Sequence, residues 1–419
     1  MVRRPRPAVL KYYLYQAADS VGFIWPIFTL FLLWNDLSYT QIGTLSAISA
    51  VLVVLFEMPT GYIADRLGRR NALSLGMVAM ALSTAGFVVA ETFPEFVGLY
   101  VLWALSMALQ HGTADAWLYS TLKERTDAEA FTRIRGHGGA VHQLVSVVTM
   151  ISGGFLYVAH PTYPFAASAI LNGIGAFVVL TMPQNADVED PETTVGVREA
   201  ASIIRTQLAR PSLRAFLPYV ALFFGIVSVA DTYIQPITVG VLESLVVPSA
   251  LAPATVGIAI PEKATLGFMY AGFALVAAVA SYHAETIRAR LGLRRALLLL
   301  PVLTAVLFLA PLVVSLLAIP VFFVMKGAGD LSKPLVNQYL NDRTDDAGRA
   351  TVLSVASMAY AFVRAPLKPL AGLVADLTTP ITTVGALGAG FLVVAAAVFL
   401  VATPIEADSV GRSAGEGAD

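Results

Sequence analysis

Twelve apolar stretches, each long enough to cross a bilayer as a helix, constrain the fold of this chain more than any other feature. A helix needs roughly 20 mainly apolar residues to cross the hydrocarbon core of a membrane. The pattern therefore predicts an all-α membrane protein with twelve transmembrane helices. The predicted spans cover residues 10–34, 39–63, 71–91, 95–122, 136–158, 164–182, 213–242, 264–287, 294–312, 314–340, 350–375 and 380–403.

The composition agrees with a membrane protein and argues against several classes of function. Hydrophobic residues make up 57% of the chain and charged residues 13%, whereas a soluble domain is about half apolar and a quarter charged. The net charge of −1 provides no basic surface for nucleic acid. The chain has no cysteine, no H-E-x-x-H metal motif and no nucleotide-binding G-x-x-x-x-G-K-S/T loop. We therefore expect no metal, no cofactor and no enzymatic activity.

Lysine and arginine are distributed unevenly between the two sides of the predicted membrane. Of the 27 basic residues, 22 lie in the termini, in the central polar segment or in alternate turns, and the opposite turns hold only Lys263. Cytoplasmic loops of membrane proteins carry such an excess, so both termini are predicted to be cytoplasmic. Arginine outnumbers lysine 21 to 6, which favours the plasma membrane of a prokaryote as the location of this multi-pass protein.

Two short segments recur at matched places in the two halves of the chain. "ADRLGRR" (64–70) is echoed by "ARLGLRR" (289–295), and "KERTDAEAFTR" (123–133) by "NDRTDDAGRAT" (341–351). Cytoplasmic turns also converge on basic residues for topology alone, but paired echoes favour two pseudo-symmetric six-helix bundles. The predicted parts are an N-terminal bundle (1–183), a cytoplasmic linker with an amphipathic helix (184–212), a C-terminal bundle (213–404) and a disordered tail (405–419).

The turn after the second predicted span carries a recognisable motif. "GYIADRLGRR" (61–70) matches the signature G-x-x-x-D-R-x-G-R-R of the major facilitator superfamily, at the place where that signature is found. The chain resembles this superfamily over essentially its whole length. The resemblance implies a fold of two six-helix bundles and secondary active transport of a small solute by alternating access. The motif does not identify the solute.

The small and acidic residues of the motif have a physical logic. Gly61 lets the second helix approach a partner helix closely, and Gly68 permits a sharp reversal of the chain. The resemblance implies that Asp65 lies at the N-terminus of span eleven, near Gly348, where free N–H groups and the helix dipole favour an anion. We expect these residues to form a latch that closes the cytoplasmic face.

The arginines of the motif have two interpretations. Arg66, Arg69 and Arg70 are expected to pair with Glu124 and Asp127 at the cytoplasmic end of the fourth span. Alternatively, the arginines only keep the turn in the cytoplasm.

Charged residues inside the predicted spans are the candidate functional residues. Each costs about 2.5–3.5 kcal/mol at the centre of a bilayer unless it is paired or faces water. The C-terminal half holds Asp231 in span seven, Lys326, Asp330 and Lys333 in span ten, and Arg364 and Lys368 in span eleven. The N-terminal half holds the acids Asp19, Glu57 and Asp115, with His111 four residues before Asp115.

These groups predict one cavity with an acidic and a basic wall. The C-terminal set is predicted to hold an anionic or zwitterionic solute, with Lys326, Arg364 and Lys368 as the binding cations. Asp19, Glu57, Asp115 and His111 are the proton-coupling candidates. Alternatively, Asp330 is paired with Lys326 or Lys333 as a structural link between neighbouring turns.

Two further alternatives remain open at this point. In the first alternative, the solute is a drug-like compound that the protein exports. Drug–proton antiporters carry an arginine in span four and a Gly-Pro in span five, and this chain has neither. In the second alternative, the chain is a receptor or scaffold that transports nothing. The buried charges disfavour this alternative, because a scaffold gains nothing from their cost in the membrane. The expected partners are a small solute, protons or another coupling ion, and lipid, with the protein a monomer.

Overall fold

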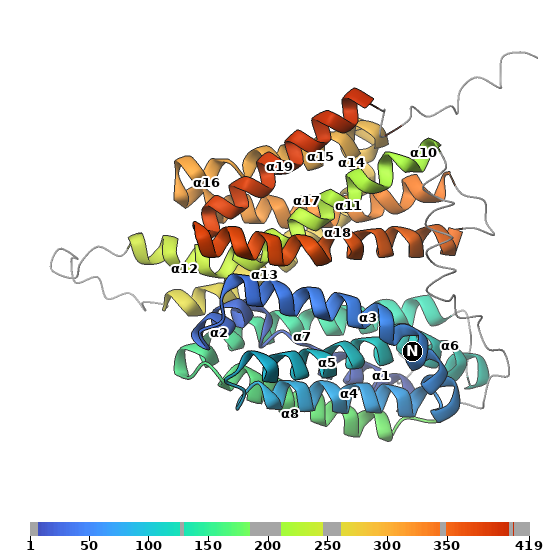
Figure 1. Cartoon of the computed structure of the whole chain (residues 1–419). Coiled ribbons are helices and arrows are strands. Elements are labelled where there is room, and N and C mark those ends of the chain that lie inside the picture. Colours follow the sequence, from blue (N-terminus) through green and yellow to red (C-terminus); the bar gives the residue numbers. More distant parts are fainter. Residues whose placement is uncertain are drawn as a thin grey trace, which may run out of the picture. The chain divides into compact units, whose positions relative to one another are not determined.

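The computed structural model describes residues 7–125, 130–184, 211–245, 261–343, 349–401 and 405. All regular elements in these ranges are helical (Figure 1). Nine helices in the described ranges are long and apolar enough to cross a membrane. The predicted linker helix, the tail after Ile405 and Asp127 lie outside the described residues, as do the side chains of Asp65 and Glu124.

The helices of the first half overlap the first six predicted spans. They are α1 (Pro7–Ala18), η1 (Trp25–Ile27), α2 (Phe28–Trp34), α3 (Tyr39–Leu67), α4 (Arg69–Gly86), α5 (Phe93–Gln110), α6 (Thr113–Arg125), α7 (Phe131–Ala159) and α8 (Tyr163–Leu180).

The helices of the second half overlap the other six predicted spans. They are α10 (Pro211–Arg214), α11 (Phe216–Ala230), η3 (Asp231–Tyr233), α12 (Ile234–Leu245), α13 (Glu262–Tyr282), α14 (Ala284–Leu291), α15 (Leu293–Leu307), α16 (Ala310–Val313), η4 (Ser315–Leu317), α17 (Ala318–Asn341), α18 (Arg349–Leu377) and α19 (Pro380–Val401). The expectation of an all-α membrane protein is confirmed.

Several predicted spans are not continuous helices. The first span has no helix between Ala18 and Trp25. The seventh passes through the 3₁₀ turn η3, which begins at Asp231. The fourth breaks at Gly112, whose φ of 75° lies in the left-handed region that glycine adopts without strain. A break leaves backbone N–H and C=O groups without helical partners, and these groups need other partners inside a membrane.

The turns that echo each other in sequence share one backbone conformation. Gly68 joins α3 to α4 with φ 80° and ψ 143°, and Gly292 joins α14 to α15 with φ 78° and ψ 148°. Both angles require a residue without a side chain. The reversal expected at Gly68 is therefore present, and the second half repeats it.

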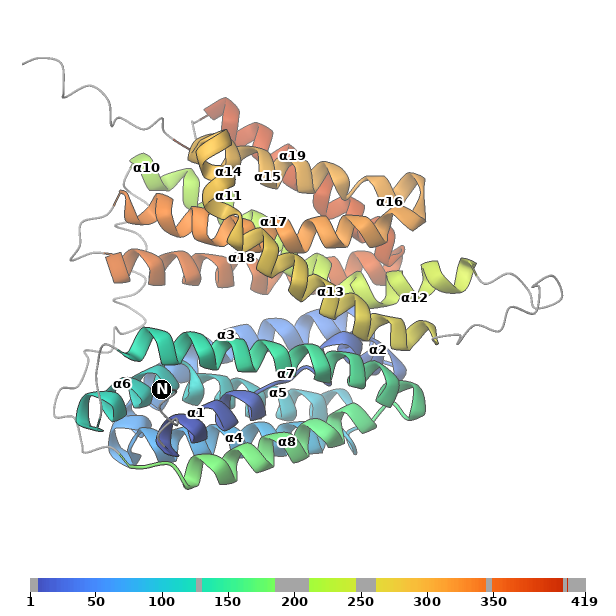
Figure 2. The ribbon, with the colours of Figure 1, turned by 180° about the vertical axis from the view of Figure 1, so that it is seen from behind.

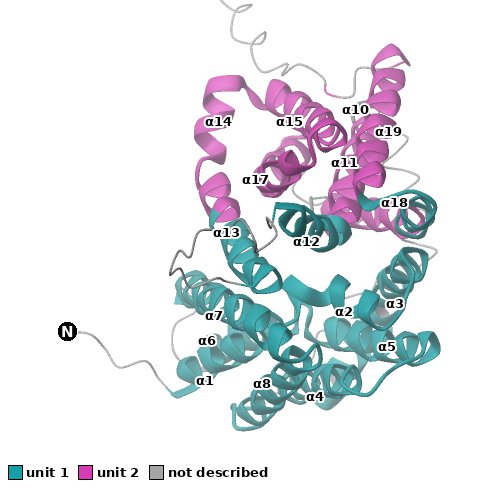
Figure 3. Cartoon of the chain, turned by 90° about the vertical axis from the view of Figure 1, so that its left-hand side faces the viewer, with its two compact units in different colours: residues 1–196, 232–275, 368–380 teal, residues 197–231, 276–367, 381–419 magenta. Residues whose placement is uncertain are grey.

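The described chain forms two compact units, coloured separately in Figure 3. Unit 1 comprises residues 1–196, 232–275 and 368–380, and unit 2 comprises 197–231, 276–367 and 381–419. In unit 1, α4 packs against α5 and α8, and α1 packs against α7 and α8 (Figure 2). In unit 2, α17 packs against α11, α14 and α15.

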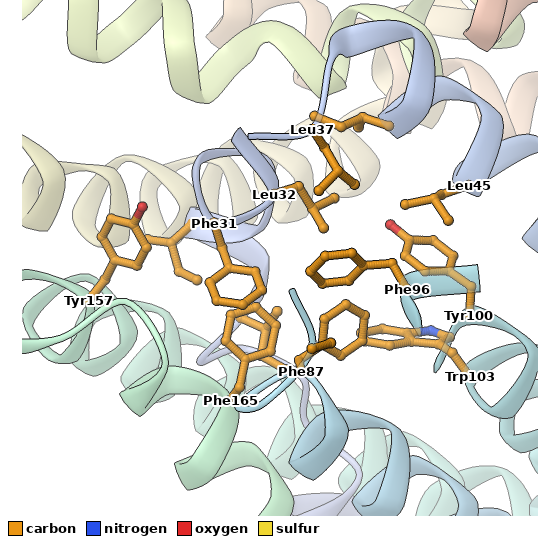
Figure 4. Packing of buried hydrophobic residues seen from close by; sticks show 14 of the residues in the cluster. Phe31, Leu32, Leu37, Leu45, Phe87, Phe96, Tyr100, Trp103, Tyr157 and Phe165 are labelled. Carbon is orange, nitrogen blue, oxygen red and sulfur yellow. The ribbon is translucent and has the colours of Figure 1, made fainter. Parts of the chain in front are cut away.

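The core of unit 1 contains a cluster of aromatic side chains (Figure 4). The ring centroids of Phe31 and Phe165 lie 4.0 Å apart, and Phe87 stacks on Phe165 at 5.2 Å. Phe96 and Trp103 close the cluster from α5. Lipid tails are as apolar as these side chains, so the hydrophobic effect does not drive helices together inside a bilayer. Close packing of side chains holds the helices together instead.

Candidate functional site

Unit 2 contains a cavity of about 460 Å³ with charged and apolar side chains in its wall. It lies among α11, η3, α17 and α18, and apolar side chains such as Phe224 and Val227 line the rest of its wall. Its charged lining residues are Asp231, Lys326, Asp330, Lys333 and Arg364. Five of the six residues predicted to hold the solute therefore lie around one space.

Two ion pairs lie in this lining. Lys326 Nζ lies 2.5 Å from Asp231 Oδ1, and the two side chains remain 21% and 25% exposed. Lys333 Nζ donates a hydrogen bond of 2.6 Å to Asp330 Oδ1, one turn earlier on α17. The Lys333–Asp330 pair agrees with the structural alternative for Asp330. The Lys326–Asp231 pair joins η3 to α17.

Arg364 is the third cation of the cavity. It is half-buried on α18, one turn after Tyr360, which also lines the cavity. Among the described residues, no hydrogen bond or ion pair reaches its guanidinium group. Three cations and two carboxylates leave a net positive charge in the lining, which favours a negatively charged group in the cavity.

Lys368 does not line this cavity. It lies one turn after Arg364 on α18, but it belongs to unit 1. There its carbonyl oxygen packs against α3, where a Cβ placed on Gly43 would lie 2.4 Å from that oxygen. The spacing of four residues predicted a shared role for Arg364 and Lys368, and of the two only Arg364 lines this cavity.

Two of the three candidate acids of the first half, Glu57 and Asp115, form pairs in unit 1. His111 Nδ1 lies 3.5 Å from Glu57 Oε1, and Arg135 Nε donates a hydrogen bond of 2.8 Å to Asp115 Oδ1. The break at Gly112 lies between His111 and Asp115, so they do not share one helical face as their spacing suggested. The predicted span places Arg135 in a cytoplasmic turn, whereas α7 begins earlier, at Phe131, and includes it.

Asp19 lies at the break in the first span, as Asp231 does at the break in the seventh. Its side chain is half-buried. Next to it, the Ser20 hydroxyl lies 3.0 Å from Ser146 Oγ and 3.1 Å from Thr149 Oγ1 on α7. Within the described ranges, the Asp19 carboxylate has neither a hydrogen bond nor an ion pair. Asp19 is therefore the unpaired counterpart of Asp231.

The described arginines of the sequence motif contact neutral groups. Arg69 donates hydrogen bonds to the carbonyl oxygen of Ala116, at 3.0 Å, and to the Ser120 hydroxyl on α6. Arg70 donates to the carbonyl oxygen of Met182, at 3.4 Å. The Arg66 guanidinium stacks 4.5 Å from the centre of the Tyr62 ring. The arginines thus join the turn to its own half of the chain.

Comparison with known proteins identifies the family to which these features belong. The model of the Major Facilitator Superfamily matches residues 16–262. The chain belongs to the major facilitator superfamily (MFS). The resemblance carried by residues 61–70 is confirmed, and with it the class of membrane transporters.

Curated relatives are similar at low identity. The MFS-type transporter YxaM of Bacillus subtilis (strain 168) is 25% identical over 146 residues, which span 35% of this chain and 36% of that protein. The class B tetracycline resistance protein of Escherichia coli is 25% identical over 327 residues, which span 74% of each chain.

Solved structures confirm the fold. The nucleoside transporter NupG is similar with a TM-score of 0.76 at 12% identity, over 94% of this chain and 97% of that one. A D-xylose–proton symporter is similar with a TM-score of 0.64 at 14% identity, over 95% and 97%. At this identity the likeness concerns the MFS fold alone.

Proposed function

We propose that this MFS protein is a secondary active transporter of a small solute that carries an anionic group, either as an anion or as a zwitterion. It works by alternating access as a monomer in the plasma membrane of a prokaryote, with both termini in the cytoplasm, and it has no enzymatic activity. The transport class follows from the family, and the solute class follows from the charged cavity of unit 2.

The observation that carries this proposal is the guanidinium of Arg364 in the cavity wall. Uncompensated charge in a membrane span costs about 2.5–3.5 kcal/mol. The carboxylates of the lining already have partners in Lys326 and Lys333. A solute carboxylate or phosphate therefore supplies the counter-charge for Arg364, and a planar guanidinium binds such groups in a bidentate way.

Asp19 is the proposed proton-coupling group. It occupies in the first span the place that Asp231 occupies in the seventh, but it lacks the lysine that neutralises Asp231. A carboxyl group without a salt-bridge partner is available to take up and release a proton. Glu57, His111 and Asp115 provide further proton-binding groups in the same half. The name of the D-xylose–proton symporter shows that proton coupling occurs on this fold.

Uptake into proteoliposomes with an imposed pH gradient tests the proposal. The parent and Arg294→Ala are expected to accumulate an anionic or zwitterionic solute, and Arg364→Ala is expected to lose accumulation. Arg294 is the matched control, because it is an exposed arginine in unit 2 that is absent from the cavity lining. Equal accumulation by all three proteins contradicts the assigned solute site.

Export of a drug-like compound is the second candidate, favoured by the similarity to the tetracycline resistance proteins. Resistance of cells that express the chain distinguishes it: a raised tolerance to an uncharged or cationic drug, independent of Arg364, supports export. A receptor or scaffold that transports nothing is the alternative in which both assays remain negative.

A further inference from the structure

The N-terminus of α3 is held by a carboxylate from the far end of the chain. Asp376, near the C-terminus of α18, accepts hydrogen bonds from the backbone N–H of Tyr39 at 2.8 Å and of Thr40 at 2.9 Å. It accepts a third, of 2.6 Å, from the Thr40 hydroxyl. The first N–H groups of a helix have no intrahelical partner and favour an anion. Asp376 thus caps α3 from another helix.

Backbone contact surrounds these hydrogen bonds. A Cβ on Gly372, one turn before Asp376, would lie 2.3 Å from the carbonyl oxygen of Tyr39. A Cβ on Gly43, one turn after Tyr39, would lie 2.4 Å from the carbonyl oxygen of Lys368. Glycines that let two backbones touch are typical of tight helix pairs in membranes. The ends of α3 and α18 therefore form a close backbone contact, with the exposed Asp376 carboxylate as a charged cap at its surface.

Gln235 makes a second contact within unit 1. It is buried on α12, and its Oε1 accepts hydrogen bonds from the N–H groups of Thr29, at 2.8 Å, and Leu30, at 3.2 Å. Its Nε2 donates to the carbonyl oxygen of Trp25 at 2.9 Å. These backbone groups are available because the first span is broken before α2. A side chain of span seven therefore supplies hydrogen-bond partners to backbone groups of span one.

The sequence around Asp376 repeats a spacing in the motif turn. "GLVAD" (372–376) ends α18, and "GYIAD" (61–65) approaches the end of α3. Both place an aspartate four residues after a glycine, so that the two residues share a helix face. Helix α3 receives the Asp376 cap at its first turn and carries Asp65 near its last. In the predicted topology these are its external and cytoplasmic ends.

We propose that Asp376, together with Tyr39 and Thr40, is an outer latch that keeps the external face of the protein closed. Gln235 assists it at the break in the first span. The outer latch opposes the cytoplasmic turn around Asp65, so that the same helix, α3, is fastened at one end or at the other. The inference rests on alternating access, the mechanism in the proposed function, but its test requires no solute and no transport.

The test uses the absence of cysteine from the chain. Spin labels on Val89→Cys and Leu245→Cys report the separation of the two halves at their external ends in nanodiscs. Both side chains are exposed in unit 1, at 78% and 53%, and both lie apart from the latch in sequence. Asp376→Asn is expected to shift the population about tenfold toward longer distances, as the loss of one charge-assisted hydrogen bond predicts.

Three further variants decide the interpretation. Glu91→Gln removes an exposed carboxylate of unit 1 whose side chain makes no hydrogen bond in the described ranges, and it is expected to leave the distances unchanged. Thr40→Val removes only the hydroxyl bond and is expected to give a smaller shift in the same direction. Asp65→Asn is expected to shift the population the opposite way.

The outer latch is overturned if Asp376→Asn and Thr40→Val both give the distances of the parent, even where the melting temperature falls, because Asp376 is then only a helix cap. If Asp376→Asn does not elute as a single species, Thr40→Val alone decides. Loss of uptake in Arg364→Ala with unchanged latch distances supports the solute site and contradicts only the latch. Shifted latch distances with equal uptake by the parent and Arg364→Ala support the latch and contradict the solute site.

Discussion

The ammonium nitrogen of Lys326 lies 2.5 Å from a carboxylate oxygen of Asp231, and the pair joins α17 to the 3₁₀ turn that interrupts span seven. Two charges in a membrane span are tolerated because each neutralises the other. The pair also leaves Arg364 as the cavity cation with no ion pair in the described ranges. The charge distribution of the proposed solute site therefore depends on Asp231.

Removal of one partner of this pair is expected to destabilise the protein. Asp231→Asn leaves the Lys326 ammonium without its counter-charge, at a cost of roughly 2 kcal/mol, below the 3–5 kcal/mol of a fully buried pair because both side chains are partly exposed. Thermal unfolding in detergent measures the effect. The double variant Asp231→Asn/Lys326→Gln is expected to recover part of the loss. A single variant as stable as the parent contradicts the pairing.

Replacement of Gln235 is expected to disturb the break in the first span. Gln235→Ala leaves the N–H groups of Thr29 and Leu30 and the carbonyl oxygen of Trp25 without this partner. An unsatisfied buried polar group costs about 1–3 kcal/mol, so the melting temperature is expected to fall clearly. Gln338→Ala is the control, because Gln338 is half-buried on α17 and its amide has no hydrogen bond in the described part of the chain. Equal melting temperatures for the two variants contradict the role of Gln235.

A methyl group at the crossing of α3 and α18 is expected to separate the helices. Gly372→Ala places a carbon 2.3 Å from the carbonyl oxygen of Tyr39, so the backbones must move. The expected cost is about 1–3 kcal/mol, as in other overpacked sites. Gly240→Ala on α12 has open space around its Cβ and is expected to leave the melting temperature nearly unchanged. A tolerated Gly372→Ala contradicts the tight contact.

Asp19 is expected to control the response to pH but not the binding of the solute. Asp19→Asn keeps the size of the side chain and removes its ability to take up and release a proton. The variant is expected to exchange solute across proteoliposomes without a gradient and to lose accumulation driven by an imposed pH gradient. Glu91→Gln serves as the matched control. Gradient-driven accumulation that survives in Asp19→Asn assigns coupling to another residue.

The helices of this fold could be predicted because hydrophobic runs report directly on membrane spans. The motif turn could be predicted equally well, because glycine adopts a φ of 80°, as at Gly68, without strain. The breaks in spans one and seven could not, because proline in a span does not by itself mark a break: Pro59, Pro301 and Pro334 lie inside the continuous helices α3, α15 and α17. Gly112 left a trace, as a glycine in a polar stretch of span four.

The candidate site could be predicted as a set of residues but not as a set of pairs. A charge inside a span predicts a functional or paired residue, and this reasoning found Asp231, Lys326 and Arg364. Which charges meet depends on the crossing of helices that are distant in sequence, as for Lys326 and Asp231. Asp376 escaped notice because it lies at the end of a span, where a carboxylate costs little.

The most direct measurement is a ligand screen by thermal unfolding of purified protein, run in parallel on the parent, Arg364→Ala and Arg294→Ala. An anionic or zwitterionic solute is expected to raise the melting temperature of the parent and of Arg294→Ala, and to leave that of Arg364→Ala unchanged. A solute that stabilises Arg364→Ala as much as the parent contradicts the central claim that the cavity of unit 2 binds its anionic group through Arg364.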